Sequence, residues 1–150
     1  MVIGKKVAIF FILPLRIKYE NAVVIKIQEG DYMKVLLAVG SDQVSKNIAD
    51  RYLEKFNETL EYKTVFYFKA LIDEVRRNPS YDAIVINEDA LAQYKSKDND
   101  QIDAELFGYV DTITDEVQDT NIVYICSNRR TRGDSFVVRL YHLGIYNILR

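Results

Sequence analysis

Three arginines, Arg129, Arg130 and Arg132, lie within the stretch 127–133, just after an apolar segment that ends at Cys126. Guanidinium groups bind phosphate and carboxylate oxygens through paired hydrogen bonds. A helix that begins just after them would add a dipole that favours anions. This loop therefore predicts an anion-binding or nucleotide-binding site, and the alternative interpretation is a solvated surface loop. No glycine-rich phosphate loop accompanies the arginines.

Carboxylates form a second candidate group. Glu88 and Asp89 directly follow Asn87, and Asp42 comes soon after another apolar segment. Carboxylate oxygens are the usual ligands of Mg²⁺, and an aspartate can accept a phosphoryl group. Helix capping and loop solvation explain the same residues without any function.

A run of four acids, Asp98, Asp100, Asp103 and Glu105, superficially suggests calcium. The run lacks the glycine and the terminal glutamate of an EF-hand loop. We interpret it as a solvated loop, which makes the connection from Glu88 to about Asp103 longer than most loops of this kind.

Composition limits the classes of function. The chain has 150 residues, of which 49% are hydrophobic and 28% charged, with a formal net charge of −2. This length suits one domain, and the balanced charge gives no reason to expect nucleic acid as a partner. The longest apolar run, 7–15, is too short to span a membrane and has no cleavage site of a signal peptide. We expect a cytoplasmic protein.

Cysteine and histidine each occur once, as Cys126 and His142. A disulfide framework or a Cys/His metal site is therefore excluded within one chain. Neither residue lies in a motif of nucleophilic catalysis. We expect no catalytic residues, no metal and no cofactor, and hence no enzyme.

Strand-like and helix-like segments alternate from Met33 onward. The expected strands are 34–39, 63–68, 82–87, 121–126 and 145–149, and the expected helices lie between them. Val44, Ile48, Tyr52 and Phe56, for example, recur at helical spacing. Such alternation predicts right-handed crossovers onto a parallel sheet, with the apolar strand 82–87 at its centre.

This order of elements, together with Tyr-Asp-Ala-Ile-Val-Ile-Asn at 81–87 and Gly-Ile-Tyr-Asn-Ile-Leu at 144–149, resembles the receiver domains of bacterial two-component systems. The resemblance covers residues 33–150. It implies an α/β, flavodoxin-like, doubly wound parallel sheet of five strands in the order 2-1-3-4-5. The chain ends at the fifth strand, so we expect the family's last helix to be absent and the domain to be truncated before it.

The resemblance also assigns roles to residues. Asn87 stands where a receiver carries its phosphoacceptor aspartate, and an amide is no useful nucleophile. The family's acidic pair falls near 39–41, which leaves Asp42 as a displaced acid. The switch hydroxyl maps to Cys126 or Ser127, and the family's lysine falls beyond Arg150. The alternative is a working receiver with a rearranged acidic site of Asp42, Glu88 and Asp89.

Degenerate receivers of this kind include N-terminal domains of ParA/MinD-like ATPases in Tad pilus assembly, which this sequence is similar to. The likeness implies a signalling or localisation module that binds a protein partner or forms a homodimer. Tyr141 and Tyr146 fall on the face that receivers use for partners, and core packing is the alternative for both.

Residues 1–32 lack clear periodicity. The codons of Gln28, Glu29 and Gly30 can spell a ribosome-binding sequence ahead of Met33, so we interpret this extension as the product of a mis-annotated start. The alternative is a genuine β-hairpin or interaction arm.

Overall fold

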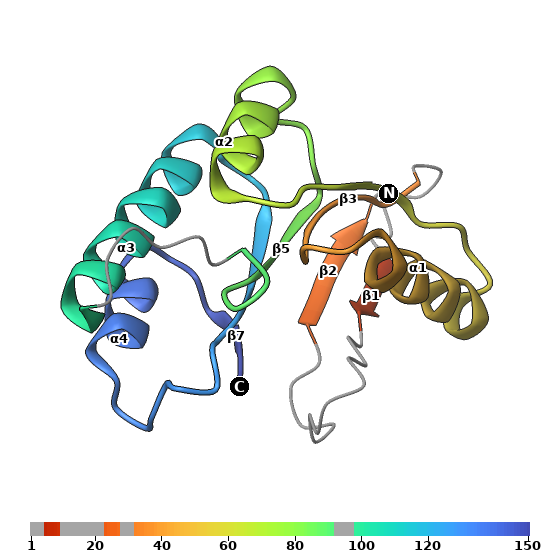
Figure 1. Cartoon of the computed structure of the whole chain (residues 1–150). Coiled ribbons are helices and arrows are strands. Elements are labelled where there is room, and N and C mark those ends of the chain that lie inside the picture. The colour runs from red at the N-terminus through yellow and green to blue at the C-terminus, as the bar shows by residue number, and fades with distance from the viewer. Residues whose placement is uncertain (1–4, 10–22, 28–31, 92–97) are drawn as a thin grey trace.

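The computed structural model of the chain describes residues 5–9, 23–27, 32–91 and 98–150 (Figure 1). Two strands, β1 (Lys5–Ile9) and β2 (Val23–Ile27), form a separate antiparallel ribbon. The larger unit consists of β3 (Lys34–Ala38), α1 (Asp42–Phe56), β4 (Glu61–Thr64), α2 (Phe68–Arg77), β5 (Ala83–Asn87), α3 (Asn99–Glu116), β6 (Asn121–Ile125), α4 (Ser135–His142) and β7 (Asn147–Leu149).

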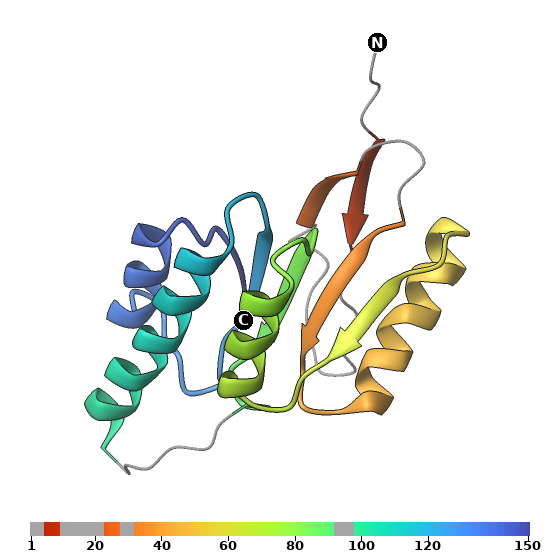
Figure 2. The same ribbon diagram turned by 90° about the horizontal axis from the view of Figure 1, so that it is seen from above.

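The larger unit is a doubly wound, flavodoxin-like α/β domain. Its five strands lie in the order β4-β3-β5-β6-β7, and every neighbouring pair is parallel. Numbered within the domain, this is the expected order 2-1-3-4-5, with β5 at the centre. Helices α2, α3 and α4 cover one face of the sheet, and α1 lies on the other (Figure 2).

The inner strands β3, β5 and β6 are mostly apolar because both faces of the sheet are buried there. Successive residues of β3 point in opposite directions, so Val35 and Leu37 pack in one cluster with α1. Leu36 and Ala38 pack in the other cluster, with α2, α3 and α4. The same alternation along β5 and β6 fills both layers of the core.

Side-chain caps set where three helices begin. The hydroxyl of Ser41 accepts a hydrogen bond from Val44 N at the start of α1. The carboxylate of Asp98 accepts from Asp100 N and Gln101 N at the start of α3, and that of Asp134 accepts from Phe136 N. These caps satisfy amide groups that have no partner within the helix.

Several boundaries differ from those expected. The second strand of the domain is β4, at 61–64 rather than 63–68, because Phe68 already begins α2. The acidic run is not a loop, since Asp98 caps α3 and the following acids lie in that helix. The last strand, β7, begins at Asn147 rather than at Ile145.

In the N-terminal extension, the described residues 5–9 and 23–27 pair as β1 and β2. The start of translation at Met33 stays a prediction. None of the helices in the described ranges has the length and apolarity needed to cross a bilayer.

Candidate functional site

Three loops follow the carboxyl ends of β3, β5 and β6, and they meet at one edge of the sheet because these neighbouring strands are parallel. Doubly wound folds bind their ligands at this edge. It carries Gly40, Asn87, Glu88 and the arginine loop at 127–133, and it is therefore the candidate site.

Asn87, to which the sequence resemblance assigns the acceptor position, ends the central strand. Its side-chain Oδ1 accepts hydrogen bonds from Asp89 N at 3.1 Å and from Ala90 N at 3.3 Å. An amide oxygen used in this way shapes a tight turn. Asn87 thus holds its own loop together.

The turn after Asn87 packs closely against the loop after β3. Gly40 has a φ of 71°, and a Cβ added to it would lie 2.8 Å from the carbonyl oxygen of Ala90. A side chain at this position would meet both backbone strain and a clash. The stretch 39–41, where receivers carry an acidic pair, thus leaves no room for a larger residue at 40.

The side chain of Glu88 is buried inside the domain, where it meets Arg130. Both side chains are fully buried. Arg130 Nη2 donates to Glu88 Oε1 at 2.7 Å, and Arg130 Nε donates to both carboxylate oxygens at 3.1 and 3.2 Å. The amide of Ser127 adds a hydrogen bond of 3.1 Å to Glu88 Oε2. A buried carboxylate needs such partners to remain charged.

Asp103, in the first turns of α3, completes the cluster. Arg130 Nη1 and Nη2 each donate to it at 2.8 Å, and Arg129 Nη2 donates to it at 2.6 Å. Burial alone would raise the pKa of Asp103, but hydrogen bonds from Arg130 and Arg129 outweigh it and hold this pKa below its usual range. The Glu88–Arg130–Asp103 cluster therefore joins β5, α3 and the loop after β6.

The guanidinium of Arg130 also stacks on an aromatic ring. Its Cζ lies 4.0 Å from the ring centroid of Phe136 in α4, a favourable cation–π geometry. Burial would lower the pKa of Arg130, but its bonds to Asp103 and Glu88 raise this pKa above the ordinary value. Arg130 stays charged and is surrounded by internal partners.

The three arginines of the loop therefore differ in role. Arg130 is used inside the domain and does not face an outside anion. Arg129 is about one-third exposed, and it pairs with Asp103 and, at 3.5 Å, with Glu88. Arg132 is exposed. The structure thus does not gather the three guanidinium groups around one open site.

The three acids of the alternative with a rearranged acidic site also differ in their surroundings. Asp42 is exposed at the start of α1, and Asp89 is exposed in the turn after β5, whereas Glu88 is buried against Arg130. Within the described parts of the chain, no group of three or more His, Cys, Asp or Glu side chains is arranged to hold a metal ion.

Cys126 and Ser127, to which the sequence resemblance assigns the switch hydroxyl, directly follow β6. Burial, followed by the charge of Glu88, raises the pKa of Cys126 to about 11. The thiol is therefore protonated at neutral pH and is a poor nucleophile.

The predicted interface tyrosines form a pair on the surface. Tyr141, in α4, and Tyr146, before β7, are 46% and 72% exposed, and their ring centroids lie 6.3 Å apart. Val138, one helical turn before Tyr141, is also exposed. Together these side chains form an aromatic patch, which we call the 138–146 patch.

A shallow groove of ≈ 530 Å³ lies elsewhere, between α2 and α3, and its wall includes Arg76, Gly108 and Tyr109. It does not include any residue of the sheet-edge site. Charges of both signs line it, so it indicates no single class of ligand.

Two residues of the cluster were missed by sequence reasoning. Asp103 lies 27 residues before Arg130, within the acidic run that the sequence predicts to be a solvated loop. Phe136 was not singled out. The signal that could have found Asp103 is its spacing of five residues from the cap Asp98, which places it in the second turn of an amphipathic helix.

The strand order defines a doubly wound parallel α/β domain. At the carboxyl ends of its strands, the charges of Glu88 and Asp103 pair with that of Arg130. No family model and no curated protein matches the chain. Among solved structures, it is similar to a chain described as a short chain dehydrogenase from Escherichia coli CFT073 complexed with NADPH, with 14% sequence identity and a TM-score of 0.39. The match covers 73% of this chain and 56% of that chain. At this level of similarity it supports no conclusion about function.

Proposed function

We propose that this chain is a non-phosphorylatable, receiver-like signalling or localisation module that acts by binding a protein partner. The observation that carries the proposal is the use of Asn87 Oδ1 by the amides of its own turn, at the end of the central strand. The family resemblance puts the acceptor carboxylate at this position. Here the side chain is neither anionic nor free to attack a phosphoryl donor.

The surroundings of Asn87 support the same proposal. A receiver holds a divalent cation between carboxylates at this edge. By the resemblance, Gly40 lies in the stretch that would carry the acidic pair. The carboxylate of Glu88, next to Asn87, accepts hydrogen bonds from Arg130 and from Ser127 N. Phosphorylation would therefore lack its nucleophile and part of its metal site.

The 138–146 patch is the surface that we propose for the partner. An exposed pair of tyrosines offers a large apolar area with hydroxyl groups at its rim, which is typical of interface anchors. By the family resemblance, the partner would be a component of a bacterial signalling or pilus-assembly system.

Site-specific photocrosslinking tests the partner surface. The full chain carries p-benzoylphenylalanine at position 146, and in a matched control at position 51, where Arg51 is exposed on α1. In cells of the source organism we expect a defined adduct with another protein from position 146 and none from position 51. Equal adducts from both positions, or none from either, would contradict the assigned surface.

A further inference from the structure

In the part of the chain that the structure describes, no strand lies along the outer edge of β4. Among the described strands, β4 pairs with β3 alone and is the last strand on its side of the sheet. Glu61, Tyr62 and Lys63 are all exposed. An open edge offers unpaired backbone groups to another strand.

Hydrogen bonds to β3 show which backbone groups of β4 face outward. Glu61 N donates to Met33 O and Val65 N donates to Leu37 O, both on the β3 side. Because backbone groups alternate between the two neighbours of a strand, the N–H and C=O of Tyr62 and Thr64 point to the open edge. Tyr62 can thus exchange two hydrogen bonds with a residue opposite it.

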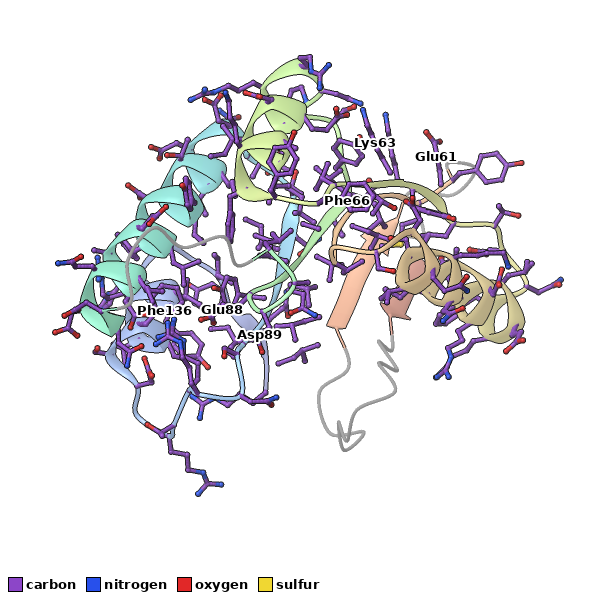
Figure 3. All side chains as sticks on the ribbon, viewed as in Figure 1. Glu61, Lys63, Phe66, Glu88, Asp89 and Phe136 are labelled. Atoms are coloured by element: carbon purple, nitrogen blue, oxygen red, sulfur yellow. The ribbon has the colours of Figure 1, made fainter. Side chains whose placement is uncertain are left out.

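The side chains beside Tyr62 carry opposite charges on one face of the sheet. Lys63 pairs with Leu36 of β3 and reaches Glu74 of α2 at 2.6 Å, so Glu61 and Lys63 face the α2 side. The two side chains point in the same direction, beside each other (Figure 3). The Lys63 side chain remains 53% exposed despite its contact with Glu74.

We propose that β4 pairs with β4 of a second copy of this chain, antiparallel and centred on Tyr62. In this register Tyr62 lies opposite its own equivalent, with its outward N–H and C=O paired. Glu61 of each copy lies opposite Lys63 of the other copy, on the same face. Cross-strand pairs of opposite charge and of aromatic rings both stabilise antiparallel strands. The two sheets join into one.

Charge selects this register over its neighbours. A pairing centred on Glu61 places two glutamates opposite each other, and one centred on Lys63 places two lysines opposite each other. Like charges in these positions destabilise a strand pair. The segment is self-complementary only about Tyr62. Phe66 and Tyr67, just after the strand, are exposed and add apolar surface.

Charge reversal tests the proposal. In Glu61→Lys the introduced lysine lies opposite Lys63, and in Lys63→Glu the introduced glutamate lies opposite Glu61. We expect each variant to raise the dissociation constant of the dimer about tenfold or more, measured by sedimentation velocity on the full chain. A mixture of the two variants should form a heterodimer, because each contact then joins opposite charges again. The mixture also shows that both variants are folded.

Two further variants sharpen the test. Tyr62→Pro removes an outward N–H and leaves the N–H groups of Glu61 and Val65, which bond to β3, intact; it should abolish the dimer. Glu54→Lys makes the same change of charge on exposed α1 and should leave the dimer unchanged. A wild-type chain that stays monomeric at hundreds of micromolar, or single variants that dimerise as well as wild type, would overturn the proposal. Neither result would affect the 138–146 patch, which lies in α4 and before β7, at the other end of the strand order.

Discussion

Arg130 and Glu88 form a buried ion pair at the edge of the sheet where this fold class binds its ligands. The two side chains have no exposed surface, and their shortest contact, from Nη2 to Oε1, is 2.7 Å. The pair joins the loop after β5 to the loop after β6. It is therefore a structural contact between these two loops.

Removal of one partner of this pair should be strongly destabilising. We expect Arg130→Ala to lower the free energy of unfolding by about 3–5 kcal/mol, because Glu88 then stays buried without its countercharge. Urea denaturation followed by circular dichroism measures the change. Arg132→Ala, at an exposed position of the same loop, is the control and should change stability by less than about 0.5 kcal/mol. Equal effects would show that the pair does not stabilise the fold.

The contribution of Asp103 should depend on pH. Because the pKa of Asp103 is lower in the folded chain than in the unfolded chain, its charged form stabilises the fold. This contribution is full above the unfolded pKa of an aspartate and is lost as the pH falls through the folded value. We therefore expect the difference in stability between wild type and Asp103→Asn to be large at neutral pH and to shrink in acid. Urea denaturation of both chains over a series of pH values measures this difference. A difference in the free energy of unfolding that stays constant with pH would contradict the prediction.

Two glycines should respond to alanine in opposite ways. Gly40→Ala places a side chain at positive φ and against Ala90, so we expect it to lower the free energy of unfolding by about 1–3 kcal/mol. Gly108 lies inside α3 with open space around its Cα. Gly108→Ala should raise stability by roughly 0.5–1 kcal/mol through helix propensity. Thermal denaturation of the two variants compares them directly, and a stabilising Gly40→Ala would contradict the close contact.

The Cys126 thiol should be slow to react. Burial raises its pKa to about 11, so little thiolate is present at neutral pH. We expect Ellman's reagent to label the native chain far more slowly than the chain unfolded in urea. A variant with Cys126→Ser and Ser80→Cys moves the thiol to an exposed position and should react quickly. Rapid labelling of native wild type would indicate an activated thiol.

The sheet and the place of Asn87 were predictable from the sequence. Both faces of the central strands are buried, so 35–39 and 83–86 are continuous apolar segments, and polar residues flank them. The sequence pattern predicts the edge strand at 63–68, whereas β4 spans Glu61–Thr64. The pattern misses its start because the residues from Glu61 to Lys63 are exposed and polar.

The pairing at the site was not predictable in the same way. Glu88 and Arg130 are 42 residues apart, and each taken alone is typical of a solvated loop. Only the packing of β5 beside β6 brings the two loops together, and only the return of α3 adds Asp103. The sequence patterns indicate where a segment is buried, but they do not indicate which charges will pair inside it.

Phosphoryl transfer is the most direct test of the proposed function. The full chain and the variant Asn87→Asp are incubated with acetyl phosphate and Mg²⁺, and intact mass spectrometry then measures any added phosphoryl group. We expect none on either chain, because Asn87→Asp restores a carboxylate but not the acidic pair, and Glu88 remains bound to Arg130. A phosphoryl group on the wild-type chain would contradict the central claim and support the working receiver with rearranged acids.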